Sequence, residues 1–467
     1  MGDRGAPSVP AVRRAAARPV DEAPSPGSGP PARHPLSLTP SRSALPAPPN
    51  GPRAPARTVT AAYPSVGPVP EAPMSHAGPI PVPRRPAGAP RPGAPSSDVD
   101  VVVVGAGVVG AAAAWQLAAR GNEVLLLDRF GPGHSHGASH GTSRIYRQTY
   151  ASDPYVRLAV EAHDLWRCLE DVTGAPLLQI TGGVDHGDDV ASVRALAASL
   201  AAHGIAHTWL DPREAEQRWP GMRFSGRVLL QPDRSGRLHA DQAVAALTAA
   251  AAGHGAVLRR HTRVERLAVR GDDRVDVATP DGRIRARRVV VAAGAWSAGL
   301  LAGLVDLPPL RVTQEQPAHF AVRGADPCRP VDPAWPTFIH HTGPAQGWPS
   351  AVYGLPAPGL GVKVGFHGVG PECDPDRRTF TAEPDQLARL QDYVARFLPG
   401  LDASRPDPVS CTYTTTPDSG FFLHAAGPLV VAAGLSGHGF KFAPALGRVL
   451  ADLAVGDATR SPLAAAG

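Results

Sequence analysis

A glycine-rich turn between two short apolar runs is the feature that most constrains how this sequence can fold. The first run, 101–104, consists of four valines, and the second, 123–127, is followed by an aspartate. An alanine-rich segment, 111–120, lies between them. Runs of this length and composition are typical of buried parallel strands, and the segment between them is typical of a helix. The sequence therefore predicts a strand–helix–strand unit here.

The turn carries three glycines in a GxGxxG arrangement, Gly105, Gly107 and Gly110. In such a unit the glycines allow a tight turn, close approach of the backbone to a pyrophosphate, and close packing of the helix on the strand. The helix N-terminus then faces the phosphates, and Asp128 can accept a hydrogen bond from a ribose hydroxyl. In this context the motif predicts a Rossmann-like dinucleotide-binding domain.

The composition divides the 467 residues into two unequal parts. Residues 1–97 hold 25 of the 53 prolines and eleven arginines, with only four acidic residues. Such a segment has no periodic apolar face to offset its ordering entropy, so we expect a disordered tail. The remaining part, 98–467, has 35 basic and 37 acidic residues. This balance does not favour binding to nucleic acid.

Membrane, secreted and metal-binding proteins are also disfavoured. The uncharged stretch 101–119 is as long as a membrane span, but its glycine turn favours the nucleotide-binding unit. No apolar segment follows the twin arginine at Arg13, as an export signal requires. The four cysteines form neither a disulfide framework nor a CxxC metal site. We therefore expect a cytoplasmic protein without a bound metal.

Lysine is almost absent from the chain. Of 46 basic residues only Lys363 and Lys441 are lysines. An ammonium group is more compact than a guanidinium and changes its ionisation more readily. We therefore predict a chemical role for both lysines.

Three further segments carry a resemblance to a known family. They are GASHGTSRIYR from Gly137, CTYT from Cys411 and GLSGHGFKF from Gly434. In this order and spacing they resemble the monomeric sarcosine oxidase and N-methyl-L-tryptophan oxidase family, over about 98–460. A late strand pattern at 287–296 is likewise typical of flavoproteins whose nucleotide-binding domain is interrupted in sequence.

The resemblance implies a two-domain α/β flavoprotein. We expect an FAD-binding domain built from 98–180, 236–305 and 406–460. We expect a substrate domain, with a mixed sheet that covers the flavin, built from 181–235 and 306–405.

The family binds FAD covalently through a cysteine thioether to the flavin 8α-methyl group, and Cys411 lies at the matching position. A cysteine thiolate has the nucleophilicity that this bond requires. Cys168 fits a buried inert thiol better, and Cys328 and Cys373 are assigned no role. The expected cofactor-binding residues are Gly105, Gly107, Gly110, Asp128, Ser143, Val264 and Cys411.

The resemblance also implies a clamp for the substrate carboxylate, made by Arg147 and Lys441. Two cations in one apolar pocket are tolerable only with an anion between them. An arginine on a helix surface is the alternative reading of Arg147. Lys441 lies between Phe440 and Phe442, where a solvated lysine would be unusual.

Other family positions surround the reacting carbon and the flavin ring: Tyr353, His367, Tyr413, Gly437, His438 and Arg144. Neutral tyrosine and histidine walls favour the free-base form of an amine, which oxidation requires. For His367 a simple packing role is the alternative. The counterpart of Lys363 lies over the flavin and promotes its reaction with O2, since a fixed cation stabilises the developing superoxide. The alternative is a lysine that protects an edge strand.

We therefore expect a monomeric oxidase that acts on secondary-amine amino acids, uses O2 and releases H2O2. One alternative is an enzyme similar to D-amino-acid or glycine oxidases, with primary amine substrates. Another is a non-catalytic binding protein whose Arg/Pro-rich tail recruits an acidic partner. Tyr146 and Gln148, which flank Arg147, depart from the family pattern, as does the missing acidic residue in 140–143. The substrate therefore stays open.

Overall fold

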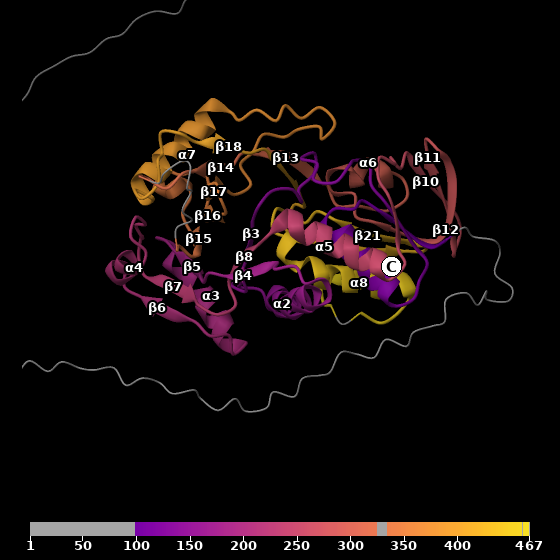
Figure 1. Cartoon of the computed structure of the whole chain (residues 1–467), viewed down its shortest axis with the longest axis horizontal. Coiled ribbons are helices and arrows are strands. Elements are labelled where there is room, and N and C mark those ends of the chain that lie inside the picture. Colours follow the sequence, from indigo (N-terminus) through magenta and orange to yellow (C-terminus); the bar gives the residue numbers. More distant parts are fainter. Residues whose placement is uncertain (1–98, 325–333, 460, 467) are drawn as a thin grey trace, which may run out of the picture. The chain divides into compact units, whose positions relative to one another are not determined.

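The computed structural model describes residues 99–324, 334–459 and 461–466. The expected tail at 1–97 and Cys328 lie outside the described residues. The largest sheet has nine strands (Figure 1). Across the sheet they are β22 (Ala464–Ala466), β20 (Phe422–Ala426), β21 (Leu429–Ala433), β12 (Gly282–Val291), β1 (Val99–Val104), β2 (Val124–Leu127) and β9 (Val257–Arg259), with β10 (Arg266–Gly271) and β11 (Arg274–Thr279) extending from β12.

The expected strand–helix–strand unit is confirmed as β1, α1 (Val108–Ala119) and β2, with β1 and β2 parallel. The helix begins three residues before the alanine-rich segment, so Gly110 lies in its first turn. The predicted strand at 287–296 is the end of β12 followed by the short helix η1 (Gly294–Trp296).

Helices cover one face of this sheet, and smaller elements cover the other. The helices are α1, α2 (Asp153–Thr173), α5 (Ala240–Gly253) and α8 (Ala443–Val455). Of these, α2, α5 and α8 are labelled next to one another in Figure 1. Val101 and Val103 face these helices, whereas Val102 and Val104 face the β10–β11 hairpin and α6 (Ser297–Leu301). Both faces of β1 are therefore buried, as its run of valines requires. Cys168 is exposed on α2, so the expectation of a buried thiol is wrong: its neighbours Trp166 and Leu169 occupy the buried face.

The second sheet has eight strands and is mixed, because β15 and β5 are parallel while its other neighbouring strands are antiparallel. In order they are β18 (Asp407–Pro408), β14 (Ala318–Phe320), β17 (Gly361–Phe366), β16 (Val352–Ala357), β15 (Thr337–His340), β5 (Gly183–His186), β7 (Val228–Gln231) and β6 (Thr208–Leu210). The helices packed on it are α3 (Val190–Ala202), α4 (Pro212–Arg218) and α7 (Pro384–Phe397). The expected α/β class, with a Rossmann-like domain and a mixed sheet, is confirmed.

Two small sheets lie near the cavity described below. One consists of β3 (Arg144–Tyr146), β8 (Gly236–Leu238) and β4 (Leu178–Ile180). The other pairs β13 (Arg311–Glu315) with β19 (Cys411–Thr415). Short helices η2 (Pro344–Gln346) and η3 (Phe440–Phe442) complete the described elements. The expected domain boundaries stay a prediction.

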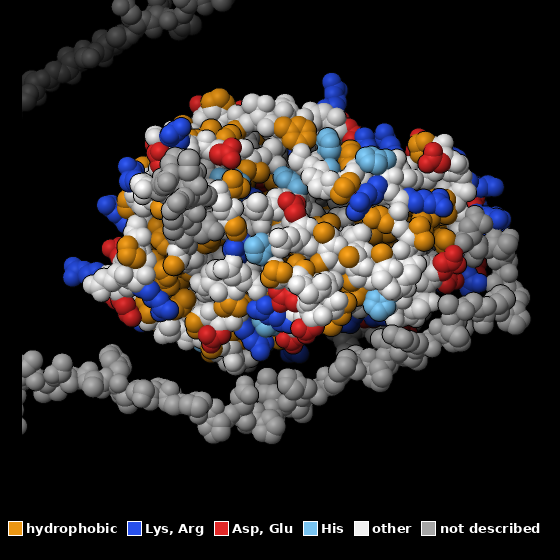
Figure 2. Space-filling model, in the orientation of Figure 1, with side chains coloured by type: hydrophobic (Ala, Val, Ile, Leu, Met, Phe, Trp, Pro, Cys, Tyr) orange, Lys and Arg blue, Asp and Glu red, His pale blue; other side chains and the backbone are white. Residues whose placement is uncertain are grey.

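The surface is mixed in charge. On the face shown in Figure 2, basic and acidic side chains are interspersed over the described part of the chain. No helix among the described residues has both the length and the apolar character that crossing a membrane requires.

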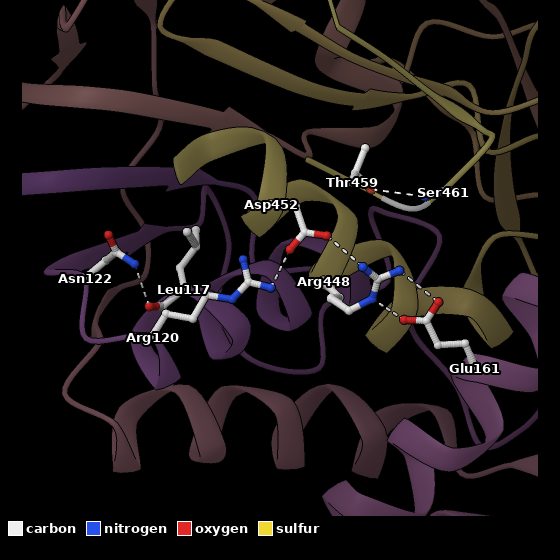
Figure 3. Close-up of polar contacts among 8 residues, drawn as sticks. All are labelled: Leu117, Arg120, Asn122, Glu161, Arg448, Asp452, Thr459 and Ser461. Atoms are coloured by element: carbon white, nitrogen blue, oxygen red, sulfur yellow. Dashed lines mark hydrogen bonds and ion pairs between the residues drawn. The ribbon is translucent and has the colours of Figure 1, made fainter. Parts of the chain in front are cut away.

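Helices α1, α2 and α8 are joined by a chain of ion pairs (Figure 3). Asp452 accepts from Arg120 at 2.6 Å and from Arg448 at 2.7 Å, and Arg448 also pairs with Glu161 on α2. Close by, α1 and α8 approach each other at Gly447, where a Cβ atom would lie only 2.5 Å from the Ala112 carbonyl carbon. The absence of a side chain at Gly447 therefore sets how closely α1 packs against α8.

The close approach predicts that Gly447→Ala destabilises the protein. Overpacking of a well-packed core typically costs about 1–3 kcal/mol. We expect a lower melting temperature than in the unmodified protein. Gly253→Ala is the matched control: it also lies in a helix, but nothing is within 4 Å of the added Cβ. Equal melting temperatures for both variants would contradict the packing argument.

Candidate active site

One cavity of about 980 Å³ is lined by residues from both large sheets. Every site residue that the sequence analysis predicted lines it, except Gly110. A cavity of this size lies at the upper end of the range for ligand sites. It is therefore large enough for a dinucleotide and a small second ligand.

The glycine motif forms one end of the cavity. Gly105 has φ +98°, and a Cβ on Gly110 would overlap the Gly105 carbonyl oxygen, so both positions require glycine. At Gly107 the nearest atom to an added Cβ is Ser139 Oγ at 3.1 Å. Gly107 is also the N-cap of α1 and lacks a side-chain cap. The Val108 N–H at the start of α1 donates to Ser139 Oγ at 3.1 Å, so this end of the cavity combines a helix N-terminus with a hydroxyl group, a combination that suits an anionic pyrophosphate.

Asp128 lies at the end of β2, beside this turn. Its carboxylate accepts hydrogen bonds from the backbone N–H groups of Ala106 and Phe130, both at 2.7 Å. Each oxygen retains a second lone pair that can accept from a ribose hydroxyl. Val264 lines the same end of the cavity. Ser143 Oγ is buried and has no hydrogen-bond partner among the described residues. These residues fit a bound FAD.

Lys363, Arg144 and Cys411 gather farther along the cavity. Lys363 lies on β17 between β14 and β16, so the edge-strand reading of this lysine is wrong. Its neighbours Val362 and Val364 face the core of the second sheet, and alternation along the strand turns Lys363 to the cavity. Burial, with the charge of Arg144, lowers the pKa of Lys363 to about 7.

Arg144 is fixed by the loop before it. Its guanidinium donates to the carbonyl oxygens of Ser143, Ala138 and His140 at 2.6–3.0 Å. His140 lines the cavity too, and burial together with Arg144 and Lys363 lowers its pKa to about 3. The histidine is neutral, and the arginine is held in one position. Cys411 Sγ is buried on β19 and lines this same part of the cavity wall.

The two expected clamp cations are both present. Arg147 follows β3 rather than lying on a helix, so the helix-surface reading is wrong. It donates to the carbonyl and hydroxyl of Thr149 and lies 3.6 Å from Asp185 Oδ1. Lys441 Nζ donates to Tyr150 Oη and to the His438 carbonyl, both at 2.9 Å. Burial and the charge of Arg147 lower the pKa of Lys441 well below its ordinary value.

Neutral aromatic groups line the region between the clamp and Cys411. Tyr413 Oη lies 3.4 Å from His367 Nδ1, and Tyr353 and Tyr413 share a hydrogen bond. Burial raises the pKa of both tyrosines above the ordinary value. Burial and the nearby cations Lys441 and Arg147 lower the pKa of His367 to about 4. All three groups are therefore uncharged at neutral pH.

Gly437 and His438 have roles that their positions explain. Gly437 has φ +74°, and a Cβ there would overlap the Tyr413 ring, so this glycine makes room for the tyrosine. His438 packs on Tyr155, Phe421 and Phe442, and burial with Lys441 lowers its pKa to about 3.

Sequence reasoning missed several residues in or beside the cavity. Tyr150 is the hydroxyl partner of Lys441, and its place three residues after Arg147 is the only signal it gave. Asp185 and the cavity-lining His341 gave no signal in the sequence. In contrast, Tyr146 and Gln148, which depart from the family pattern, are buried and do not line the cavity.

Comparison with known proteins is consistent with this geometry. Residues 100–453 match the model of a family described as FAD dependent oxidoreductase. The chain is 35% identical over 379 residues to monomeric sarcosine oxidase of Streptomyces avermitilis, covering 79% of this chain and 96% of that one. It is 31% identical to N-methyl-L-tryptophan oxidase of Salmonella arizonae, covering 76% and 94%.

A solved structure of NikD, described as an unusual amino acid oxidase essential for nikkomycin biosynthesis, superposes with a TM-score of 0.68 at 31% identity. The match covers 78% of this chain and 95% of that one. Motif, cavity and comparisons agree: the chain belongs to the FAD dependent oxidoreductases, in the family of monomeric sarcosine oxidase and N-methyl-L-tryptophan oxidase.

Proposed function

We propose that the protein oxidises the C–N bond of secondary-amine amino acids, using O2 and releasing H2O2. An N-methyl amino acid, O2 and water give the primary amino acid, formaldehyde and H2O2; a cyclic amino acid and O2 give an imine and H2O2. FAD, when bound, supplies the electron acceptor. The observation that carries the proposal is a pair of cations, Arg147 and Lys441, beside an uncharged wall that includes Tyr413 and His367.

The cations suit the carboxylate end of such a substrate. Arg147 uses Nη1 for Thr149, and its Nε and Nη2 have no hydrogen bond to the described residues, so they remain for a bidentate contact. The uncharged wall suits the amine end. A desolvated wall of uncharged groups disfavours the ammonium form, and the nitrogen lone pair must be free for oxidation.

We also propose that Cys411 attaches the flavin covalently, and that Lys363 promotes the reaction with O2. The position of Cys411 on the cavity wall beside Arg144 and Lys363 supports the first. The cavity-facing ammonium of Lys363, with no ion pair to any described residue, supports the second. We further propose a cytoplasmic enzyme, because the described cysteines are free thiols. We propose a monomer, because relatives such as that of Streptomyces avermitilis are named monomeric sarcosine oxidase.

Peroxide release from a panel of amino acids tests the reaction. We expect turnover of sarcosine, other N-methyl amino acids or cyclic amino acids, with primary amines much poorer. Amides, which lack the carboxylate charge, are expected to be poor substrates as well. Arg147→Met should weaken binding of the best substrate by about tenfold to a few hundredfold, because a charge-assisted hydrogen bond contributes roughly 1.5–3 kcal/mol.

The control for this variant is Arg157→Met. Arg157 also pairs with an aspartate, Asp153 at 2.8 Å, but it is exposed and lies outside the cavity. Preference for primary amines would favour the glycine-oxidase-like alternative. Equal turnover of an amino acid and its amide would contradict the clamp, and a purified protein without flavin would favour the binding-protein alternative.

Covalent attachment predicts the fate of the flavin in acid. Wild-type protein precipitated with trichloroacetic acid should keep its yellow colour in the pellet. Cys411→Ala should release the flavin to the supernatant, whereas Cys373→Ala, a second free cysteine outside the cavity lining, should not. If flavin stays with the Cys411→Ala pellet, another residue makes the bond.

The role of Lys363 predicts a split between the two half-reactions. Lys363→Met should leave anaerobic flavin reduction within about tenfold while slowing reoxidation by O2 at least a hundredfold, or ~2.7 kcal/mol. Since the charged form is favoured below a pKa of about 7, wild-type reoxidation should slow as pH rises through and above this value. A negative charge beside Lys363 raises the pKa of its ammonium group and so moves the midpoint of this decline to higher pH.

The pH dependence should be absent from Lys363→Met. Lys363→Arg keeps a positive charge that does not titrate in this pH range. Because a guanidinium is larger and planar, this variant tests whether reoxidation needs a compact cation. Stopped-flow absorbance measures both half-reactions. Parallel loss of reduction and reoxidation would mean that Lys363 has a general structural role instead.

A further inference from the structure

A buried acid–imidazole pair lies beside the proposed carboxylate clamp. Asp185 Oδ1 is 2.8 Å from His341 Nε2 and 3.6 Å from Arg147 Nη1. Asp185 is only 2% exposed, while the side chain of His341 is about one-fifth exposed and lines the cavity. The proposed reaction uses neither residue.

The second sheet places this pair in line with the proposed reaction site. Tyr353 on β16 is opposite Ile339 on β15, and Ile339 is opposite Asp185 on β5. Residues opposite one another share a face, so the row from Tyr353 to Asp185 lies on the cavity side of the sheet. Two strand spacings separate its ends, about 10 Å. His341 is next to Asp185, at the far end of this row.

The backbone around the pair is closely fitted. The N–H of His341 donates to the His186 carbonyl at 2.7 Å, just past the end of β15. Gly187 has φ +145°, and a Cβ there would overlap the carbonyl of His341. A glycine is required for the two segments to approach this closely. The position of His341 is therefore set by the fold and not by a free loop.

Asp185 is ionised despite its burial. Burial alone would raise its pKa, but hydrogen bonds from His341 and Thr149 and the charge of Arg147 hold the pKa below its ordinary value. The carboxylate then accepts the Nε2–H of His341. In the neutral form of His341 the ring proton is then on Nε2, which leaves Nδ1 as a hydrogen-bond acceptor. His341 Nδ1 has no hydrogen-bond partner in the described part of the chain.

We propose that Asp185 and His341 form a specificity subsite that selects substrates whose side chain carries a hydrogen-bond donor, such as a hydroxyl group. Asp185 positions His341, and Nδ1 of His341 accepts the hydrogen bond from the substrate. The carboxylate and the side chain of an amino acid leave the same carbon. With the carboxylate at Arg147, which shares Asp185 with His341, a side chain of several atoms reaches the imidazole. This inference rests on the proposed function.

Isosteric substrate pairs test the subsite. N-methyl-L-homoserine and N-methyl-L-norvaline differ only in a hydroxyl in place of a methyl group, as do N-methyl-L-tyrosine and its 4-methylphenylalanine analogue. We expect the wild-type enzyme to prefer the hydroxyl member of at least one pair by about tenfold in kcat/KM. His341→Phe should abolish this preference, because it keeps a ring but lacks an acceptor.

Two further variants separate positioning from bulk. Asp185→Asn retains an oxygen that can accept from His341 and should keep most of the preference. Asp185→Val should lose it. His203→Phe is the matched control: His203 also lies 2.8 Å from an aspartate, Asp153, but outside the cavity. This variant should keep the full preference. Loss of the preference in both histidine variants would indicate general destabilisation instead of a lost subsite.

Binding without turnover separates this inference from the proposed function. The ether analogues 4-hydroxy-2-methoxybutanoate and 2-methoxypentanoate cannot be oxidised as amines, and their binding is read from flavin absorbance. A preference for the hydroxyl analogue that His341→Phe removes supports the subsite, even if no secondary amine is turned over. No preference in the wild type, or one that His341→Phe keeps, overturns the subsite. If His341→Phe does not fold, the preference measured for the wild type decides the question by itself.

Discussion

The gathering of positive charge in one cavity is the constraint on which the rest of the site depends. Among the arginines and lysines that line it are four of the predicted site residues, Arg144, Arg147, Lys363 and Lys441. Among the described residues, Asp185 is the only carboxylate within ion-pair distance of any of them. Burial and this charge keep His367 and His438 neutral, with pKa values of about 4 and 3. The remaining charge favours anions, which a dinucleotide and an amino acid both supply.

The nucleotide-binding end was predictable because its determinants are local. The glycines and Asp128 lie within one strand–helix–strand unit, so their spacing alone fixes their geometry. The orientation of Lys363 follows from alternation once its strand is recognised. Its position inside the sheet does not, because the strands that flank it, β14 and β16, pair with it only in the folded chain.

Other features of the site depend on contacts between distant segments. Asp185 and His341 are 156 positions apart, and nothing in the local sequence of either predicts that β5 and β15 are paired. The same holds for Tyr150, which meets Lys441 across 291 positions. Gly437 was expected near the substrate, but the φ angle and the Tyr413 ring show why this position must be glycine. The side-chain partners of these residues could therefore be identified only from the folded chain, in which the order of the strands is known.

The two clamp cations have unequal surroundings, and this has a consequence for anion binding. Arg147 already has a countercharge in Asp185, whereas Lys441 bonds to uncharged groups, the Tyr150 hydroxyl and the His438 carbonyl. Burial lowers the pKa of Lys441, and a carboxylate beside it favours the charged form again. In the proposed binding mode, Lys441 therefore gains more from the arrival of the anion than Arg147 does. The arginine mainly orients the carboxylate, and the carboxylate moves the pKa of Lys441 back toward its ordinary value.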